Sequence, residues 1–281
     1  LAKLRVQDIN GRRILYPVST NQKIGWASDG RPPLFKEAFM EAGDVKAVVG
    51  LADGCELMGA LTRFPDAGLA RGVVDGSVHG DAMGCAADMT ASSGEQWEGM
   101  QAACEGFGVS EDDEVAVCDS LRRAWSLLYA RQGSGVAIFP YESAFIHVRM
   151  GAHGAPALFR TALTLRVERA MREAHALPVD AGTEPCDSAW NEWSFLARLL
   201  GNEAAALMAG DGESAALWRD RAASFTREHA GQWLPDFLAR TEEELSRLAA
   251  AGGVDRTAER FYGALAAYGR FLLTVLTERA A

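Results

Sequence analysis

Residues 183–196 read TEPCDSAWNEWSFL, an acidic turn that runs directly into a tryptophan-rich segment. Pro185 fixes its own φ angle and disfavours a helical conformation for Glu184, and Asp187 or Ser188 can then cap the helix that follows. Further along, the apolar residues recur at spacings of three and four, which places them on one face of an amphipathic helix. The stretch therefore predicts a stiff turn before a helix, with one carboxylate more than a cap requires.

A second cluster of similar composition lies upstream, where residues 139–143 read FPYES. A loop that holds Phe, Tyr and Glu together either packs into the core or presents these groups to a ligand. We expect both clusters to expose carboxylates beside large aromatic rings, a surface that suits a cationic, partly apolar peptide. A binding protein is therefore our first interpretation and an enzyme the second. A purely structural role, as a well-made helix start, is the alternative for the first cluster.

The composition is that of an ordinary globular protein, with 281 residues, 48% of them apolar and 23% charged. This length is enough for one large or two small domains with a sizeable core. The formal net charge of −10 would repel a phosphate backbone and attract a basic peptide. Nucleic acid is therefore a poor candidate partner.

Several classes of site have no signature in the sequence. The five histidines do not form a metal-ligand pair, and no phosphate-binding or dinucleotide-binding glycine motif occurs, so we expect no metal, no cofactor and no catalytic residues. Asp187 and Glu192 could form a hydrolytic carboxylate pair, but nothing else in the sequence supports that role. The scattered, odd-numbered cysteines and the absence of a long apolar run or a signal peptide predict a cytoplasmic protein without membrane insertion. The cysteines are Cys55, Cys85, Cys104, Cys118 and Cys186.

The chain divides into two parts. Residues 1–33 form an N-terminal extension, in which Asn10-Gly11 between two short β-prone runs predicts a β-hairpin. Residues 34–281 show helical periodicity, which predicts an all-α domain of about ten helices with hinges near 134–153 and 180–188. The helices are expected over about 44–63, with Asp44 as N-cap, and over 66–76, 78–90, 94–106, 110–133, 156–175, 187–209, 213–229, 233–250 and 255–279, whereas 134–153 is expected to be mainly an extended loop.

Several blocks, taken in order, resemble the TorD/DmsD/NarJ family of molybdoenzyme maturation chaperones. The block 184–188 is similar to that family's Glu-Pro-x-Asp-His motif, except that Ser188 replaces the histidine. The other similar blocks are LADGCELMGALTRFPD (51–66), WSLLY (125–129), PYES (140–143), WSFL (193–196), EHAGQWLPDF (228–237) and FY (261–262).

This resemblance implies a TorD-like helical bundle that is a chaperone and not an enzyme. Its partner would be the catalytic subunit of a molybdopterin-containing oxidoreductase, whose twin-arginine leader or apoprotein it would bind until cofactor insertion. The protein would be a monomer or a domain-swapped homodimer. The alternatives are a hydrolase or nucleotide-binding enzyme that uses the same acidic cleft, and a stable assembly subunit of the oxidoreductase.

The expected peptide site combines carboxylates with aromatic walls. Glu142, Glu184 and Asp187 would supply negative charge to two guanidinium groups. Pro140 and Pro185 would keep the two loops stiff. The apolar walls would be Trp125, Leu128, Tyr129 and Tyr141, and the remaining candidates are Ser143, Ser188 and Trp190.

Overall fold

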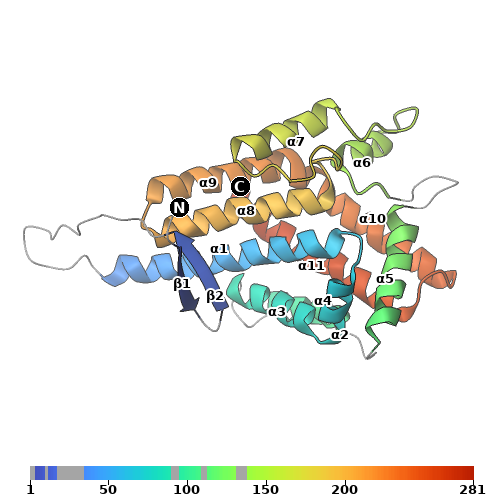
Figure 1. Cartoon of the computed structure of the whole chain (residues 1–281), viewed down its shortest axis with the longest axis horizontal. Coiled ribbons are helices and arrows are strands. Elements are labelled where there is room, and N and C mark those ends of the chain that lie inside the picture. Colours follow the sequence, from blue (N-terminus) through green and yellow to red (C-terminus); the bar gives the residue numbers. More distant parts are fainter. Residues whose placement is uncertain (1–3, 10–11, 18–34, 90–94, 109–112, 131–137) are drawn as a thin grey trace, which may run out of the picture.

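The computed structural model of this chain describes residues 4–9, 12–17, 35–89, 95–108, 113–130 and 138–281 (Figure 1). Outside the two N-terminal strands, its regular structure is helical, which confirms the predicted all-α class. The eleven α-helices within the described residues are α1 (Phe35–Thr62), α2 (Ala67–Val74), α3 (Ser77–Met89), α4 (Glu95–Cys104), α5 (Glu114–Tyr129), α6 (Glu142–Arg149), α7 (Ala162–Glu173), α8 (Ala189–Met208), α9 (Gly212–Phe225), α10 (Gly231–Ala250) and α11 (Arg256–Ala280).

Helix α8 lies at the centre of the bundle, between α1 and α9 (Figure 1). Trp193, Leu196 and Leu199 are fully buried, so α8 contributes apolar side chains to the core along much of its length. Helices α10 and α11 pack against each other, and a π-helical segment, Thr226–Ala230, joins α9 to α10. This arrangement places the start of α8 near the start of α10, a geometry that matters for the candidate site.

Side-chain caps define where several of these helices begin. Asp66, Asp113 and Ser188 each accept a hydrogen bond from a backbone N–H in the first turn of α2, α5 and α8. Such caps satisfy N–H groups that have no partner within the helix. The predicted starts of α2 and α8 are therefore confirmed, whereas α5 begins after Asp113 and not at Ser110 as predicted.

Four boundaries differ from the sequence prediction. Helix α1 begins at Phe35, so Asp44 lies inside the helix rather than at its N-cap. Helix α5 ends at Tyr129, before 133. Helix α7 begins after Thr161, because Arg160 has a φ of 58°, which a right-handed helix excludes. Helix α6 occupies part of the expected loop, because Phe145 packs on the rings of α10 and so stabilises a helix of only eight residues.

The N-terminal extension contains strands β1 (Leu4–Ile9) and β2 (Arg12–Pro17). They pair antiparallel, with Leu4 opposite Pro17 and Ile9 opposite Arg12. The Asn10-Gly11 turn lies outside the described residues, as does the first part of the 134–153 hinge. Both predicted hinges and the two-part division of the chain therefore stay predictions.

Within the described residues, no helix combines the length and the apolar character needed to cross a bilayer.

Helix α1 approaches its neighbours most closely where it carries glycine. A Cβ atom added at Gly50 would lie 2.6 Å from Cβ of Asp88 and 2.9 Å from the carbonyl oxygen of Cys85, both on α3. At Gly59 it would lie 2.6 Å from Oγ of Ser194 on α8. These separations are shorter than van der Waals contact. Helix α1 can therefore pack this closely on α3 and α8 only because the two positions are glycines, which have no side chain.

We expect Gly50→Ala to lower the free energy of unfolding by about 1–3 kcal/mol, because the new methyl group overpacks a contact with the backbone. Chemical denaturation measures this value. The matched control is Gly201→Ala in α8, where an added Cβ meets no described heavy atom within 4 Å. Since alanine favours helices over glycine, the control should gain about 0.5–1 kcal/mol. A loss of similar size in both variants would contradict the close packing of α1 on α3.

Candidate functional site

The loop at 139–143 and the turn at 184–188 lie together, although they are far apart in sequence. Tyr141 and Ser188 form an antiparallel β-bridge. The N–H of Glu142 donates to the carbonyl of Asp187 at 2.8 Å, and the N–H of Ala189 donates to the carbonyl of Pro140 at 2.9 Å. The two motifs found in the sequence are thus one structural unit at the start of α6 and α8.

Asp187 lies inside this unit, contrary to the expectation that its carboxylate would be exposed. Its side chain is fully buried, and Oδ2 accepts hydrogen bonds from the N–H of Ser143 at 2.9 Å and from the hydroxyl of Thr164 at 3.3 Å. The N-cap residue of α6, Tyr141, makes no side-chain cap of its own. Asp187 therefore caps α6 from another part of the chain, where the N-terminal end of the helix dipole favours negative charge.

Glu142 is also buried, with 1% of its surface exposed, so the expectation that its carboxylate is exposed is wrong. Its Oε2 atom lies 2.9 Å from Nδ1 of His229, in the π-helical segment before α10. Beside it, Glu192 of α8 is fully buried, and its Oε2 accepts a hydrogen bond from the indole N–H of Trp233 at 2.9 Å. Four groups from α6, α8 and the α9–α10 region thus form one polar cluster within the core.

Burial raises the pKa of Glu192 well above the usual value of a glutamate, and the neighbouring charge of Glu142 raises it further. Burial also raises the pKa of Glu142, while the hydrogen bond to His229 partly offsets this effect. Two adjacent carboxylates in a site of low polarity disfavour ionisation of both, which favours the protonated form of Glu192. A protonated Glu192 can donate a hydrogen bond to Glu142.

The expected aromatic walls are largely core residues. Leu128 is fully buried, and Tyr129 stacks on Phe237 with ring centroids 5.5 Å apart. The Tyr129 hydroxyl lies 3.0 Å from that of Thr241. Trp190, only 7% exposed, meets the ring of Tyr141 edge-on. Leu128 and Tyr129 therefore belong to the core, and Trp190 packs the 139–143 loop against the start of α8.

Four of the predicted site residues keep partial access to solvent: Trp125, Tyr141, Ser143 and Glu184. The ring of Trp125 meets that of Phe64 edge-on at 5.2 Å, and Phe64 is 51% exposed. Our list of candidates omits Phe64. The sequence contained one signal for Phe64, a large aromatic residue directly before Pro65 at the end of a predicted helix.

Glu184 has an unusual environment among these residues. Its Oε1 atom is buried and has no hydrogen-bond partner within the described part of the chain. Burial raises the pKa of Glu184, whereas a hydrogen bond with Tyr141 and the charge of Arg63 lower it. Glu184 therefore offers an unfilled acceptor at the edge of the paired loops.

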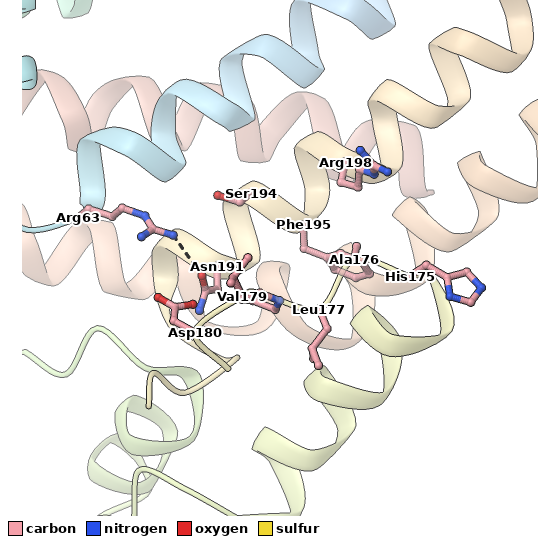
Figure 2. A pocket seen from close by; sticks show the side chains of 11 residues that line it. Arg63, His175, Ala176, Leu177, Val179, Asp180, Asn191, Ser194, Phe195 and Arg198 are labelled. Atoms are coloured by element: carbon pink, nitrogen blue, oxygen red, sulfur yellow. Dashed lines mark hydrogen bonds between the residues drawn. The ribbon is translucent and has the colours of Figure 1, made fainter. Parts of the chain in front are cut away.

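A pocket of about 620 Å³ lies next to this unit, between the end of α1, the first half of α8 and the segment after α7 (Figure 2). Asn191 links the two regions, since its Nδ2 donates to the carbonyl of Pro185 at 3.1 Å and its Oδ1 accepts from Arg63 at 3.4 Å. The charged residues that line the pocket include Arg63, Arg198 and Asp180. The pocket therefore differs from the expected acidic cleft, because none of Glu142, Glu184 and Asp187 lines it.

Within the described residues, no group of three His, Cys, Asp or Glu side chains is placed to hold a metal ion. The five cysteines are buried free thiols. Asp187 and Glu192 are both fully buried, so as placed this pair does not meet a substrate.

Comparison with known proteins gives one match. A model of the family described as "Nitrate reductase delta subunit" matches residues 86–239, more than half of the chain. The matched region includes both loops of the paired unit, the buried cluster and the pocket residues of α8. No curated protein and no solved structure matches the chain closely enough for comparison.

The buried cluster predicts how stability depends on pH. Because the pKa of Glu192 is higher in the folded protein than the ordinary value of 4.5, the folded state binds more protons above that pH. The stabilisation is complete below pH 4.5 and is lost as the pH rises toward the folded-state pKa, at up to about 1.4 kcal/mol per pH unit. Glu192→Gln keeps the neutral hydrogen bonds, so it should flatten this slope and stabilise the protein at neutral pH.

Urea denaturation between pH 4 and 8 measures the slope. Glu243→Gln, on the exposed face of α10, is the matched control and should leave it unchanged. An identical slope in wild type and Glu192→Gln would show that Glu192 is not protonated in the folded state.

Proposed function

The chain belongs to the nitrate reductase delta subunit family, whose members are chaperones of molybdoenzyme assembly, and we propose that it binds the twin-arginine leader or the adjacent apoprotein of a molybdopterin-containing oxidoreductase until the cofactor is inserted. The role in assembly follows from membership of the family. That the chain binds a leader, which residues bind it and that the protein is cytoplasmic are our proposal.

The observation that carries this proposal is the unfilled acceptor of Glu184. A buried carboxylate oxygen without a donor is unfavourable, and native structures contain few of them. A guanidinium group supplies several N–H donors in a planar fork that matches a carboxylate. An arginine side chain of the leader would therefore complete the coordination of Glu184, which the protein leaves open.

The apolar part of the leader would lie on the rings beside the paired loops. Phe64 and Trp125 meet edge-on at the end of α1, and Tyr141 lies on the loop that precedes α6. Arg122 already stacks over Phe64, with its guanidinium carbon 5.6 Å from the ring centroid. The same ring surface would accept aliphatic side chains of a leader, because it is only partly covered.

The buried carboxylates have a different role in this proposal. Asp187 and Glu142 fix the two loops to α6, α7 and α10 through hydrogen bonds, and Pro140 and Pro185 restrict the backbone beside them. A site that is already ordered loses less entropy on binding. We therefore assign Glu142 and Asp187 to positioning, and Glu184 to contact with the peptide.

The family takes its name from a subunit of nitrate reductase. This favours a second candidate function, in which the chain is a stable assembly subunit of the oxidoreductase. The two candidates differ in the lifetime of the complex. Co-purification of the chain with its oxidoreductase in constant stoichiometry after cofactor insertion would favour the stable subunit. Release on insertion would favour the chaperone.

We expect Glu184→Gln to weaken the binding of a twin-arginine leader peptide by about tenfold, because a charge-assisted hydrogen bond is roughly twice as strong as a neutral one. Calorimetry with the leader peptide measures this change. Replacing the two arginines of the peptide by glutamine should weaken binding to the wild type in the same way, and should have little further effect on the variant.

Glu213→Gln serves as the matched control, since Glu213 is an exposed glutamate in the first turn of α9, outside the paired loops. Its affinity should equal that of the wild type. Equal affinity of Glu184→Gln and wild type for the leader would reject the assignment of Glu184.

A further inference from the structure

The pocket beside the paired loops has a charge opposite to that of the protein. The chain carries a formal net charge of −10, yet two arginines and only one aspartate are among the charged side chains of this pocket. Figure 2 shows Arg63 at one end of the lining and Arg198 further along α8, with Ser194 between them. A local cationic field therefore lies within an acidic protein, where it would select an anionic partner.

The two arginines are available to a ligand. Among the described residues, neither Arg63 nor Arg198 forms an ion pair, and Arg63 makes one long hydrogen bond of 3.4 Å to Asn191. Other arginines in the same bundle are paired: Glu203 alone accepts from Arg219 at 2.8 Å and from Arg279 at 2.9 Å. The protein thus leaves these two guanidinium groups without carboxylate partners although acidic residues outnumber basic ones.

The backbone at the end of α7 brings an imidazole side chain, that of His175, to the pocket. His175 has a φ of 52°, in the left-handed region that glycine normally occupies at this position after a helix. The N–H of His175 donates to the carbonyl of Arg172 at 3.0 Å, and the N–H of Ala176 to that of Met171 at 2.8 Å. This pattern is a Schellman motif. A histidine at the position that usually holds glycine has a strained backbone, and it adds an imidazole to the lining of the pocket.

The lining also includes apolar groups. Val179 is fully exposed, and the buried Phe195 contributes to the wall from α8. The lining therefore combines cationic and apolar groups, and Asp180 adds an acceptor that can receive a peptide N–H. This combination suits a peptide with carboxylates and aliphatic side chains better than a free phosphate, which has no apolar part to contact Val179 and Phe195.

We propose that this pocket binds an acidic, partly apolar peptide segment of a partner protein, with Arg63 and Arg198 holding its carboxylates. The inference goes beyond leader binding, since it concerns a different surface and a ligand of opposite charge. Asn191 lies between the two regions and contacts both Arg63 and the carbonyl of Pro185. One partner chain with a basic and an acidic segment could therefore occupy both at once.

The test uses the full chain and an end-capped peptide that carries glutamate and leucine side chains. The control peptide has the same sequence with each glutamate replaced by glutamine. Fluorescence anisotropy should show binding of the glutamate peptide that weakens as salt is added, because exposed charges are screened. The double variant Arg63→Gln with Arg198→Gln should bind it about tenfold more weakly, since two charge-assisted contacts are lost. Arg256→Gln, an exposed arginine of α11 outside this pocket, is the matched control and should bind as the wild type does.

Two further measurements separate this site from the leader site. Circular dichroism should show the double variant folded, as expected for two exposed side chains. The single variant Arg198→Gln keeps Arg63 and its effect on Glu184, so its affinity for the leader peptide should stay within about twofold of the wild type. The proposal is overturned if both peptides bind equally, or if the double variant binds the glutamate peptide like the wild type. It is also overturned if inorganic pyrophosphate binds at the pocket while the glutamate peptide does not.

Discussion

The organisation of the candidate site depends on one contact, the antiparallel bridge between Tyr141 and Ser188. It joins two loops that start different helices, and the Asp187 carboxylate strengthens it by capping α6. A buried charge is costly unless it is paired and hydrogen-bonded, so the surrounding donors are part of the same unit. Glu142, with His229 behind it, anchors the unit to the α9–α10 region. The position of Glu184 at the surface follows from this internal arrangement.

The sequence predicted those features that local physics determines. Ser188 caps α8 as expected, and the central tryptophans of that helix are in the core. It also identified both loops of the site. It failed where tertiary contacts decide: α6 has only eight residues and is stabilised by the packing of Phe145 on the rings of α10. The exposure of Glu142 depends on His229, a residue far along the chain, so composition alone predicted it wrongly.

The charge of individual sites was equally difficult to predict from the sequence. The net charge of −10 describes the whole chain, but it gives no indication of the pocket that contains Arg63 and Arg198. Of the three carboxylates expected at the surface, Glu142 and Asp187 are instead buried, with Glu142 beside His229, whereas Glu184 keeps partial access to solvent. Net charge constrains the partner of a protein through its average field, whereas each site depends on which side chains the fold brings together.

The central claim is that the buried Asp187 couples the two loops into one unit. Hydrogen exchange of the Asp187→Ala variant tests it most directly, because the mutation removes the acceptor of the Ser143 N–H and of the Thr164 hydroxyl. The account predicts faster exchange in residues 142–149 and 187–191 together, with α11 unchanged. Faster exchange confined to 187–191, with α6 as protected as in the wild type, would contradict it.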